Sequence, residues 1–181
     1  MGNKRLFVDM DGTLAEFKKI DTLEKLYEEG YFFHLKPQMN VVLAIKEMIK
    51  NPEIEVFIMS SVLSDSKYAL DEKNRWLDFY LPEIDEEHRI FPACGEDKKD
   101  YIPNQSFGGN DFLLDDYTHN LTLWEPPGVG IKLLNDINNT HGTWKGKRVE
   151  YSLNPDKLYK KILEAMKPEI PERKMNLGKS R

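Results

Sequence analysis

The chain has 181 residues, which is enough for one domain with a sizeable hydrophobic core. Hydrophobic residues make up 40% and charged residues 31%, an ordinary composition for a globular protein. The formal net charge of -5 excludes the basic surface that nucleic-acid-binding proteins use, so we expect no nucleic-acid partner.

No apolar run approaches the roughly 18 residues that a membrane-spanning helix requires, so we expect no membrane association. The first residues lead directly into a strand-like run and contain no signal-peptide core. The single cysteine, Cys94, allows no intramolecular disulfide and favours a reducing compartment. We expect it to be a small, partly buried side chain, and we expect a cytoplasmic protein.

Short apolar runs alternate with helical patterns along the first half of the chain. The expected elements are strands over 6–8 and 55–59 and helices over 21–30, 37–50 and 68–80. An aromatic cluster at 31–33 separates the first two helices. This alternation is typical of units in which a helix connects two parallel strands.

The second half continues the alternation. The expected elements are strands over 89–91 and 112–114 and helices over 129–138 and 155–167. Residues 168–181 are polar and interrupted by proline, so we expect a flexible tail. The pattern predicts an α/β fold, a doubly wound parallel sheet with helices on both faces.

Polar residues follow three of the predicted strands at the point where each strand ends. Asp9-Met10-Asp11-Gly12-Thr13 follows the first strand, Ser60-Ser61 the second, and Asp115-Asp116 the fourth. Lys73 lies on the helix after the second strand. Because ligands of such sheets bind beyond the carboxyl ends of the strands, we expect these groups to converge.

Each group suits phosphoryl transfer, which depends on positioning and charge neutralisation. Asp9 ends its strand and can attack phosphorus as a nucleophile. Asp11, two residues on, can protonate the leaving oxygen and later deprotonate the attacking water. The Ser60 hydroxyl and the Lys73 ammonium can hold the phosphoryl oxygens.

Two carboxylates and a phosphate repel one another, so this chemistry requires a cation. Oxygen ligands and a phosphate substrate favour Mg²⁺. We expect Asp9 and Asp115 as direct ligands, with Asp116 as the alternative to Asp115, and Asp11 through its backbone oxygen.

These motifs resemble those of the haloacid dehalogenase superfamily of aspartate-nucleophile phosphatases. A closer resemblance is to the 5'(3')-deoxyribonucleotidases and their bacterial and phage relatives. It is carried by residues 9–17, which are similar to DMDGVLADF, by the aromatic segment 30–37, by 55–61, and by 72–76, which is similar to EKYAW. The likeness covers about residues 6–116.

The resemblance implies a Mg²⁺-dependent hydrolase of nucleoside monophosphates that forms an aspartyl-phosphate. It also implies one phosphatase domain over residues 1–167, with a small cap at about 15–36 that is shorter than in the family. Ser61 matches a position near the phosphate, and Lys98 or Lys99 a basic residue near the site. The implied nucleoside-binding residues are Phe17, Tyr31, Phe32 and Phe33.

Several alternatives stay open at this point. The four aromatic residues could instead be core packing between cap and sheet, and His119 could reach the cleft. The substrate could be a sugar phosphate or another small phosphoester, and the chain could be a non-catalytic phosphate-binding module. The sequence does not give the oligomeric state, and a homodimer stays open.

Overall fold

The computed structural model describes residues 3–17, 20–135, 137 and 143–167. Within these residues, six parallel strands form one sheet in the order β3-β2-β1-β4-β5-β6. The strands are β1 (Lys4–Val8), β2 (Ile54–Met59), β3 (Arg89–Ile90), β4 (Asp111–Asp115), β5 (Val129–Leu134) and β6 (Lys147–Glu150). The strand order runs outward from β1 in both directions, so the α/β prediction of a doubly wound parallel sheet is confirmed.

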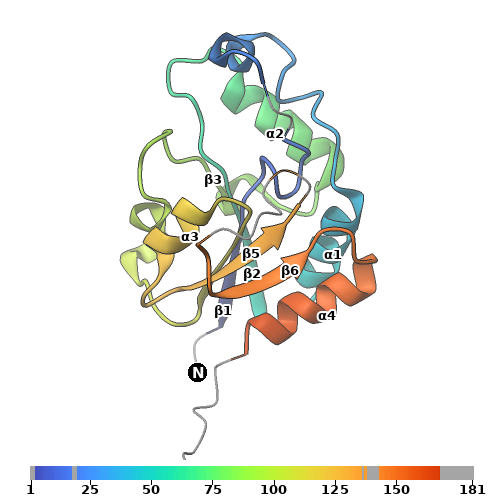
Figure 1. The fold of residues 1–181 in the computed structure, drawn as a ribbon, viewed down its shortest axis with the longest axis vertical. Coiled ribbons are helices and arrows are strands. Elements are labelled where there is room, and N and C mark those ends of the chain that lie inside the picture. The colour runs from blue at the N-terminus through green and yellow to red at the C-terminus, as the bar shows by residue number, and fades with distance from the viewer. Residues whose placement is uncertain (1–2, 18–19, 136, 138–142, 168–181) are drawn as a thin grey trace, which may run out of the picture.

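Helices cover both faces of the sheet (Figure 1). The α-helices are α1 (Met39–Ile49), α2 (Ala69–Tyr80), α3 (Thr118–Trp124) and α4 (Pro155–Ala165). Short 3-10 helices are η1 (Leu23–Tyr27), η2 (Glu86–His88), η3 (Lys98–Tyr101) and η4 (Pro103–Gln105). Helices α1 and α4 lie together on one face, and α3 lies on the other. None of the helices in the described part of the chain has the length and apolar character that crossing a bilayer requires.

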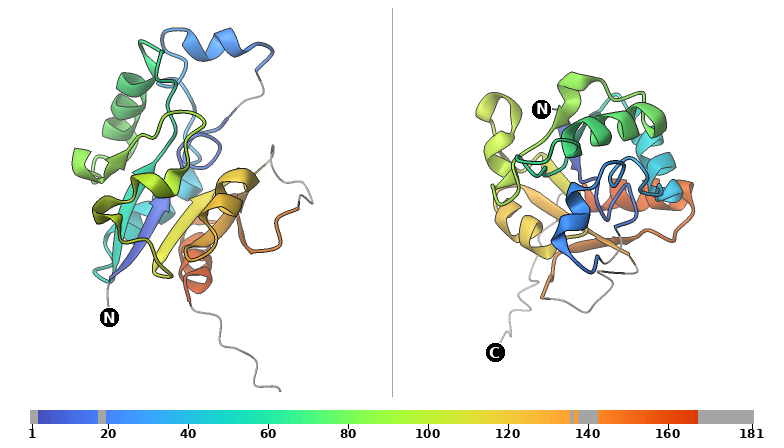
Figure 2. Two further views of the ribbon diagram at one scale, coloured as in Figure 1. Left: turned by 90° about the vertical axis from the view of Figure 1, so that its left-hand side faces the viewer. Right: turned by 90° about the horizontal axis from the view of Figure 1, so that it is seen from above.

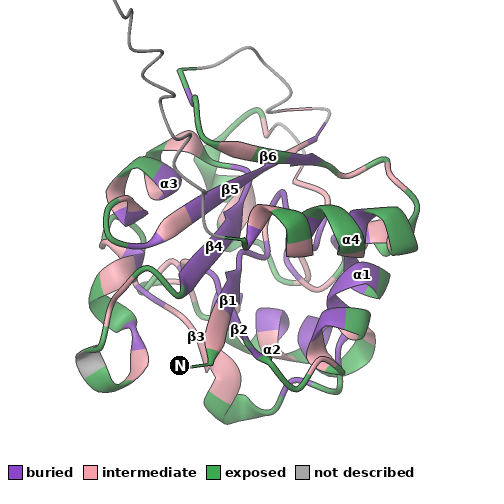
Figure 3. Cartoon of the chain, turned by 90° about the horizontal axis from the view of Figure 1, so that it is seen from below, coloured by how far each residue is buried: buried purple, intermediate pink, exposed green. Residues whose placement is uncertain are grey.

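Alternating side chains of the central strands build two cores. Leu6 and Val8 of β1 belong to the larger core with α1, α2 and α4. Phe7, between them, points to the opposite face, where its ring lies 5.0 Å from that of Phe57 and 5.2 Å from that of Trp124. The centre of the sheet is therefore buried on both sides, as the purple of strand β4 in Figure 3 shows.

Two elements at the β5 end of the sheet differ from the prediction. The helix expected over 129–138 is wrong, because Val129–Leu134 forms strand β5, which pairs Ile131 with Leu114. Strand β6 was not expected, since it has charged residues on either side of its single buried residue, Val149. Gly130 of β5 leaves room for the ring of Trp144, which lies just before β6, because a Cβ at position 130 would come 2.8 Å from that ring.

The expected cap leaves the sheet after β1 and stands beside α2 (Figure 2). Its helix is shorter than the one expected over 21–30, because only the exposed 3-10 helix η1 forms. Residues 18–19 of the cap lie outside the described residues. The predicted tail, 168–181, lies outside them as well.

Candidate active site

Three buried carboxylates meet where the two central strands end. Asp9 follows β1, Asp115 ends β4, and Asp116 comes next. One oxygen from each of the three lies within 4.8 Å of the others. The structure therefore brings together the residues that the sequence placed at separate strand ends.

The ammonium of Lys98 lies between two of these carboxylates. Its Nζ is 2.6 Å from Asp9 Oδ1 and 2.7 Å from Asp115 Oδ2, and all three side chains are buried. Burial raises the pKa of Asp9, and the negative charges of Asp115, Asp11 and Asp116 raise it further, although Lys98 opposes them. Burial alone would lower the pKa of Lys98, but Asp115 and Asp9 hold it above its usual value. The cluster thus has an excess of buried negative charge.

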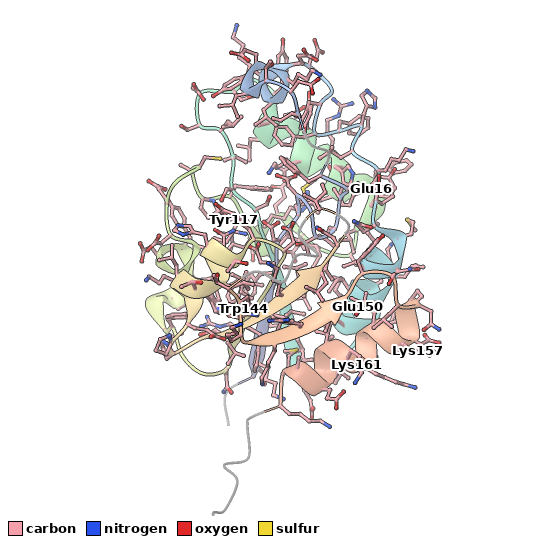
Figure 4. The ribbon with its side chains drawn as sticks, viewed as in Figure 1. Glu16, Tyr117, Trp144, Glu150, Lys157 and Lys161 are labelled. Carbon is pink, nitrogen blue, oxygen red and sulfur yellow. The ribbon has the colours of Figure 1, made fainter. Side chains whose placement is uncertain are left out.

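Backbone and amide donors fix the orientation of Asp115. The backbone N–H of Tyr117 donates to Asp115 Oδ1 at 2.7 Å, and Asn120 Nδ2 donates to Asp115 Oδ2 at 2.9 Å. Tyr117, labelled in Figure 4, immediately precedes α3. The start of this helix therefore positions both donors against the carboxylate.

A second asparagine ties Asp116 to the loop after β1. Asn135, buried just beyond β5, donates from Nδ2 to Asp116 Oδ2 at 2.9 Å and to the Gly12 carbonyl at 2.6 Å. Asn135 and Asn120 were both missed from the sequence. Asn120 is a lone amide a few residues beyond a predicted strand, where asparagine is usually a turn or cap residue, and Asn135 lies inside the stretch that was expected to be a helix. No sequence signal distinguished them.

Asp11 faces a different partner. Its Oδ2 lies 2.5 Å from Lys73 Nζ, which also donates to Ser60 Oγ at 2.9 Å and to the Ser61 carbonyl at 2.7 Å. Its other oxygen, Oδ1, is buried without a hydrogen-bond partner in the described residues. The Asp11 carboxylate is therefore outside the three-carboxylate cluster, and one of its oxygens accepts no hydrogen bond from the described residues.

Gly12 is required by its conformation and by its neighbour. Its φ is +89°, and a Cβ there would lie 2.4 Å from Asp116 Oδ2. We expect Gly12→Ala to lower the free energy of unfolding by about 2–4 kcal/mol, because backbone strain adds to displacement of Asp116.

Urea denaturation measures this loss, and Gly95→Ala is the matched control. Gly95 has a φ of +93°, but a Cβ added there would meet no atom within 4 Å, so only the backbone cost applies. That cost is about 1–2 kcal/mol. Equal losses in the two variants would show that close approach to Asp116 is not the reason for glycine at position 12.

A cavity of about 620 Å³ opens above the carboxylates. Seven of the predicted site residues line it: Asp9, Asp11, Asp115, Asp116, Ser61, Phe17 and Phe32. Lys98, Lys99 and His119 line it too. Ser60 and Lys73 are fully buried behind Asp11 and join the site through the hydrogen bonds above.

The rest of the cavity wall is mixed. Leu26 from η1 and Leu63 from the loop after β2 supply apolar surface, while Tyr117 and Asn120 supply polar atoms. Cys94 also lines the cavity and is exposed, so the expectation of a partly buried cysteine is wrong. It lies in the loop after β3 that forms one rim.

Two of the predicted aromatic residues lie away from the cavity wall. The Phe33 ring packs under the guanidinium of Arg75, whose Cζ is 4.3 Å from the ring centroid. The Tyr31 ring packs edge-on against Phe32 at 5.0 Å, and its hydroxyl is buried without a described hydrogen-bond partner. The structure therefore separates Phe17 and Phe32, at the cavity, from Tyr31 and Phe33, in the packing behind it.

Comparison with solved structures shows which known fold this architecture matches. A haloacid dehalogenase-like hydrolase from Burkholderia xenovorans LB400 superposes with a TM-score of 0.54 at 10% identity, over 93% of this chain and 100% of that one. The chain has a haloacid dehalogenase-like fold.

Two further structures are less similar. They are a Pnkp1/Rnl/Hen1 complex and a Pnkp1/Rnl/Hen1 RNA repair complex, with TM-scores of 0.48 and 0.49 at 17% identity over 71% and 72% of this chain. This chain covers 46% and 43% of the lengths of those chains, less than half of either. No family model matches the sequence, and no curated protein matches it.

The three carboxylates are a donor set that fits Mg²⁺. All their ligand atoms are oxygens, which hard divalent cations prefer. The Lys98 ammonium, held by two of them, shows that the cluster accommodates positive charge.

Proposed function

We propose that the chain is a Mg²⁺-dependent phosphomonoester hydrolase in which Asp9 is the nucleophile. The observation that carries the proposal is the convergence of Asp9, Asp115 and Asp116 within 4.8 Å at the ends of neighbouring strands. A second carboxylate, Asp11, lies beside them with a lysine partner. One edge of the sheet thus carries the side chains to which we assign the roles of nucleophile, metal ligands and acid–base group.

The proposed reaction has two steps. A carboxylate oxygen of Asp9 attacks phosphorus, the ester P–O bond breaks, and the leaving oxygen takes a proton from Asp11. Water then attacks the phosphorus of the aspartyl-phosphate and gives a proton to Asp11. The bond between phosphorus and the Asp9 oxygen breaks, so phosphate is released and the Asp9 carboxylate is restored. The unpartnered Oδ1 of Asp11 is the oxygen we assign to these proton transfers.

The remaining residues neutralise and hold the phosphate. Asp9, Asp115 and Asp116, with the backbone oxygen of Asp11, would hold Mg²⁺, which supplies charge neutralisation for the phosphoryl group. Ser60, Ser61 and Lys73 would bind its oxygens, since Lys73 already joins the two serines.

The finer proposal is that the substrate is a nucleoside monophosphate, as for a 5'-nucleotidase or deoxyribonucleotidase. A cavity of about 620 Å³ has room for a nucleoside, and Phe17 and Phe32 offer aromatic surface to a base or sugar. A sugar phosphate is the second candidate, favoured by the polar groups of His119, Asn120 and Lys99 on the same wall.

A panel of phosphomonoesters tests both levels of the proposal. We expect the protein to release phosphate in the presence of Mg²⁺ and to stop in EDTA. We also expect kcat/KM for a deoxynucleoside monophosphate to be at least about tenfold above that for any hexose phosphate, because a tenfold preference corresponds to the energy of one good aromatic contact. Faster turnover of a sugar phosphate would overturn the nucleotide assignment. Absence of phosphate release from every ester would overturn the hydrolase and leave a binding module.

A further inference from the structure

The residue next to Lys73 on α2 is a buried carboxylate with backbone partners. Glu72 is 2% exposed, and its oxygens accept hydrogen bonds from three backbone N–H groups of the cap. The donors are Gly30 at 2.5 Å, Phe32 at 2.9 Å and Phe33 at 3.3 Å. Glu72 therefore joins α2 to a segment 40 residues earlier in the chain.

The buried carboxylate of Glu72 is stabilised only by the backbone of the cap, among the residues that the structure describes. Among the described residues, no lysine or arginine forms an ion pair with it. A buried carboxylate needs hydrogen bonds in place of lost water, and here the cap backbone supplies them. The charge is therefore well solvated only while segment 30–33 stays against the helix.

The same face of α2 holds the other end of this segment. Trp76, one turn after Glu72, is fully buried, and its Nε1 donates to the Leu35 carbonyl at 2.8 Å. Helix α2 thus fixes the cap backbone at both ends of the stretch 30–35.

Phe32 connects this attachment to the site. Its backbone N–H is held by Glu72, and Phe32 is one of the residues that line the cavity, although it is only 4% exposed. The Lys73 ammonium lies 4.8 Å from the centroid of the Phe32 ring. Glu72 and Lys73 are consecutive residues of α2, and they contact the backbone and the ring of Phe32. They therefore hold Phe32, which we call the aromatic wall of the cavity, at a fixed position relative to Lys73.

We propose that Glu72 is a positioning residue that sets the aromatic wall of the cavity and thereby selects for substrates with a large leaving group. The inference rests on the proposed phosphohydrolase function for its kinetic part. Glu72 lies outside the cavity and touches no reacting atom; it acts through the placement of Phe32. Small esters, which do not need that wall, would be insensitive to it.

Hydrogen exchange of backbone amides tests the positioning without any need for catalysis. In Glu72→Gln we expect amides 30, 32 and 33 to exchange roughly tenfold to hundredfold faster, because hydrogen bonds to a charged acceptor are lost. Amides of β1 and β4 should not change. Asp71→Asn is the matched control, since Asp71 is the adjacent acid and its side chain is 71% exposed. Unchanged exchange at the three cap amides would overturn the positioning role.

Kinetics test the selectivity. For Glu72→Gln we expect KM for a nucleoside monophosphate to rise about tenfold, while KM and kcat for glycerol phosphate, whose leaving group is small and has no ring, each change less than about twofold. Equal losses on both substrates would overturn selection by leaving group. If Glu72→Gln does not fold, Glu72→Asp keeps the charge, and we expect smaller changes of the same kind. If the parent protein releases no phosphate, the proposed function fails and the selectivity claim falls with it, whereas hydrogen exchange still decides the positioning role.

Discussion

Asp9→Asn should abolish phosphate release while leaving the fold intact. The amide cannot attack phosphorus, so we expect kcat to fall by at least about 10⁴-fold, as when other enzymes lose a nucleophile. The measurement is phosphate release under saturating Mg²⁺ from the ester that the parent protein hydrolyses fastest.

The same variant should be as stable as the parent at pH 7, or more stable. Burial raises the pKa of Asp9, so the native state holds its charged form at a cost that the unfolded state does not have. An uncharged amide of the same shape removes that cost, and its oxygen can still accept from Lys98 at the position now 2.6 Å away. Urea denaturation in EDTA measures the difference. A gain in stability with a loss of activity is typical of a residue kept for function.

The control for Asp9 is another carboxylate on the cavity wall. Asp97 lines the cavity but lies outside the three-carboxylate cluster, and its contact with Lys99 is a partly exposed ion pair at 3.6 Å. Asp97→Asn should keep kcat within about threefold, as expected for an ion pair of this kind. Near-normal turnover in Asp9→Asn would refute the assignment of Asp9 as the nucleophile, whatever the turnover of Asp97→Asn.

The central strands and the site carboxylates were predictable from the sequence because local and global signals agree there. Residues 6–8 and 112–114 are apolar runs long enough for a strand and too short for a helix, and each ends on aspartate. In a parallel sheet, adjacent strands end at one edge, so their last residues must be neighbours. The meeting of Asp9 with Asp115 follows from that topology.

The edge of the sheet beyond β4 was not predictable on the same grounds. The run over 129–134 has apolar residues that fit a helix or a strand, and its partners decide between them. β4 lies on one side of it and β6 on the other, and the Trp144 ring occupies the space that Gly130 leaves open. These contacts are tertiary, and no window of the sequence contains them.

The contacts around the site that the sequence could not show are those between residues far apart in the chain. Asn135 bonds to a carbonyl 123 residues away, and Glu72 to amides about 40 residues away. The sequence left open whether Lys98 or Lys99 is the basic residue near the site. The structure places the ammonium of Lys98 between the carboxylates and leaves Lys99 partly exposed.

Lys98→Met should produce the largest loss of stability among the variants considered. In EDTA we expect the free energy of unfolding to fall by about 3–5 kcal/mol, the usual cost of removing one partner of a buried ion pair. Lys98 is 4% exposed, and its ammonium is the charge that Asp9 and Asp115 share at 2.6 and 2.7 Å. Without it, three neighbouring carboxylates repel one another in a buried site.

Mg²⁺ should restore much of this loss. A cation that binds the native carboxylates and not the unfolded chain stabilises by mass action, and the variant offers it more uncompensated negative charge than the parent. We therefore expect Mg²⁺ to raise the free energy of unfolding of Lys98→Met by more than that of the parent. Paired urea titrations, with EDTA and with saturating Mg²⁺, measure both differences.

Lys99→Met separates this effect from a general loss of positive charge. Lys99 is the next residue, carries the same charge and lines the same cavity, but its side chain is 36% exposed. We expect its stability to change by less than about 0.5 kcal/mol, as for most surface substitutions. If Lys98→Met matched Lys99→Met in EDTA, the cluster would not depend on a buried counter-charge. If Mg²⁺ stabilised the parent and Lys98→Met equally, the three carboxylates would not be the cation site.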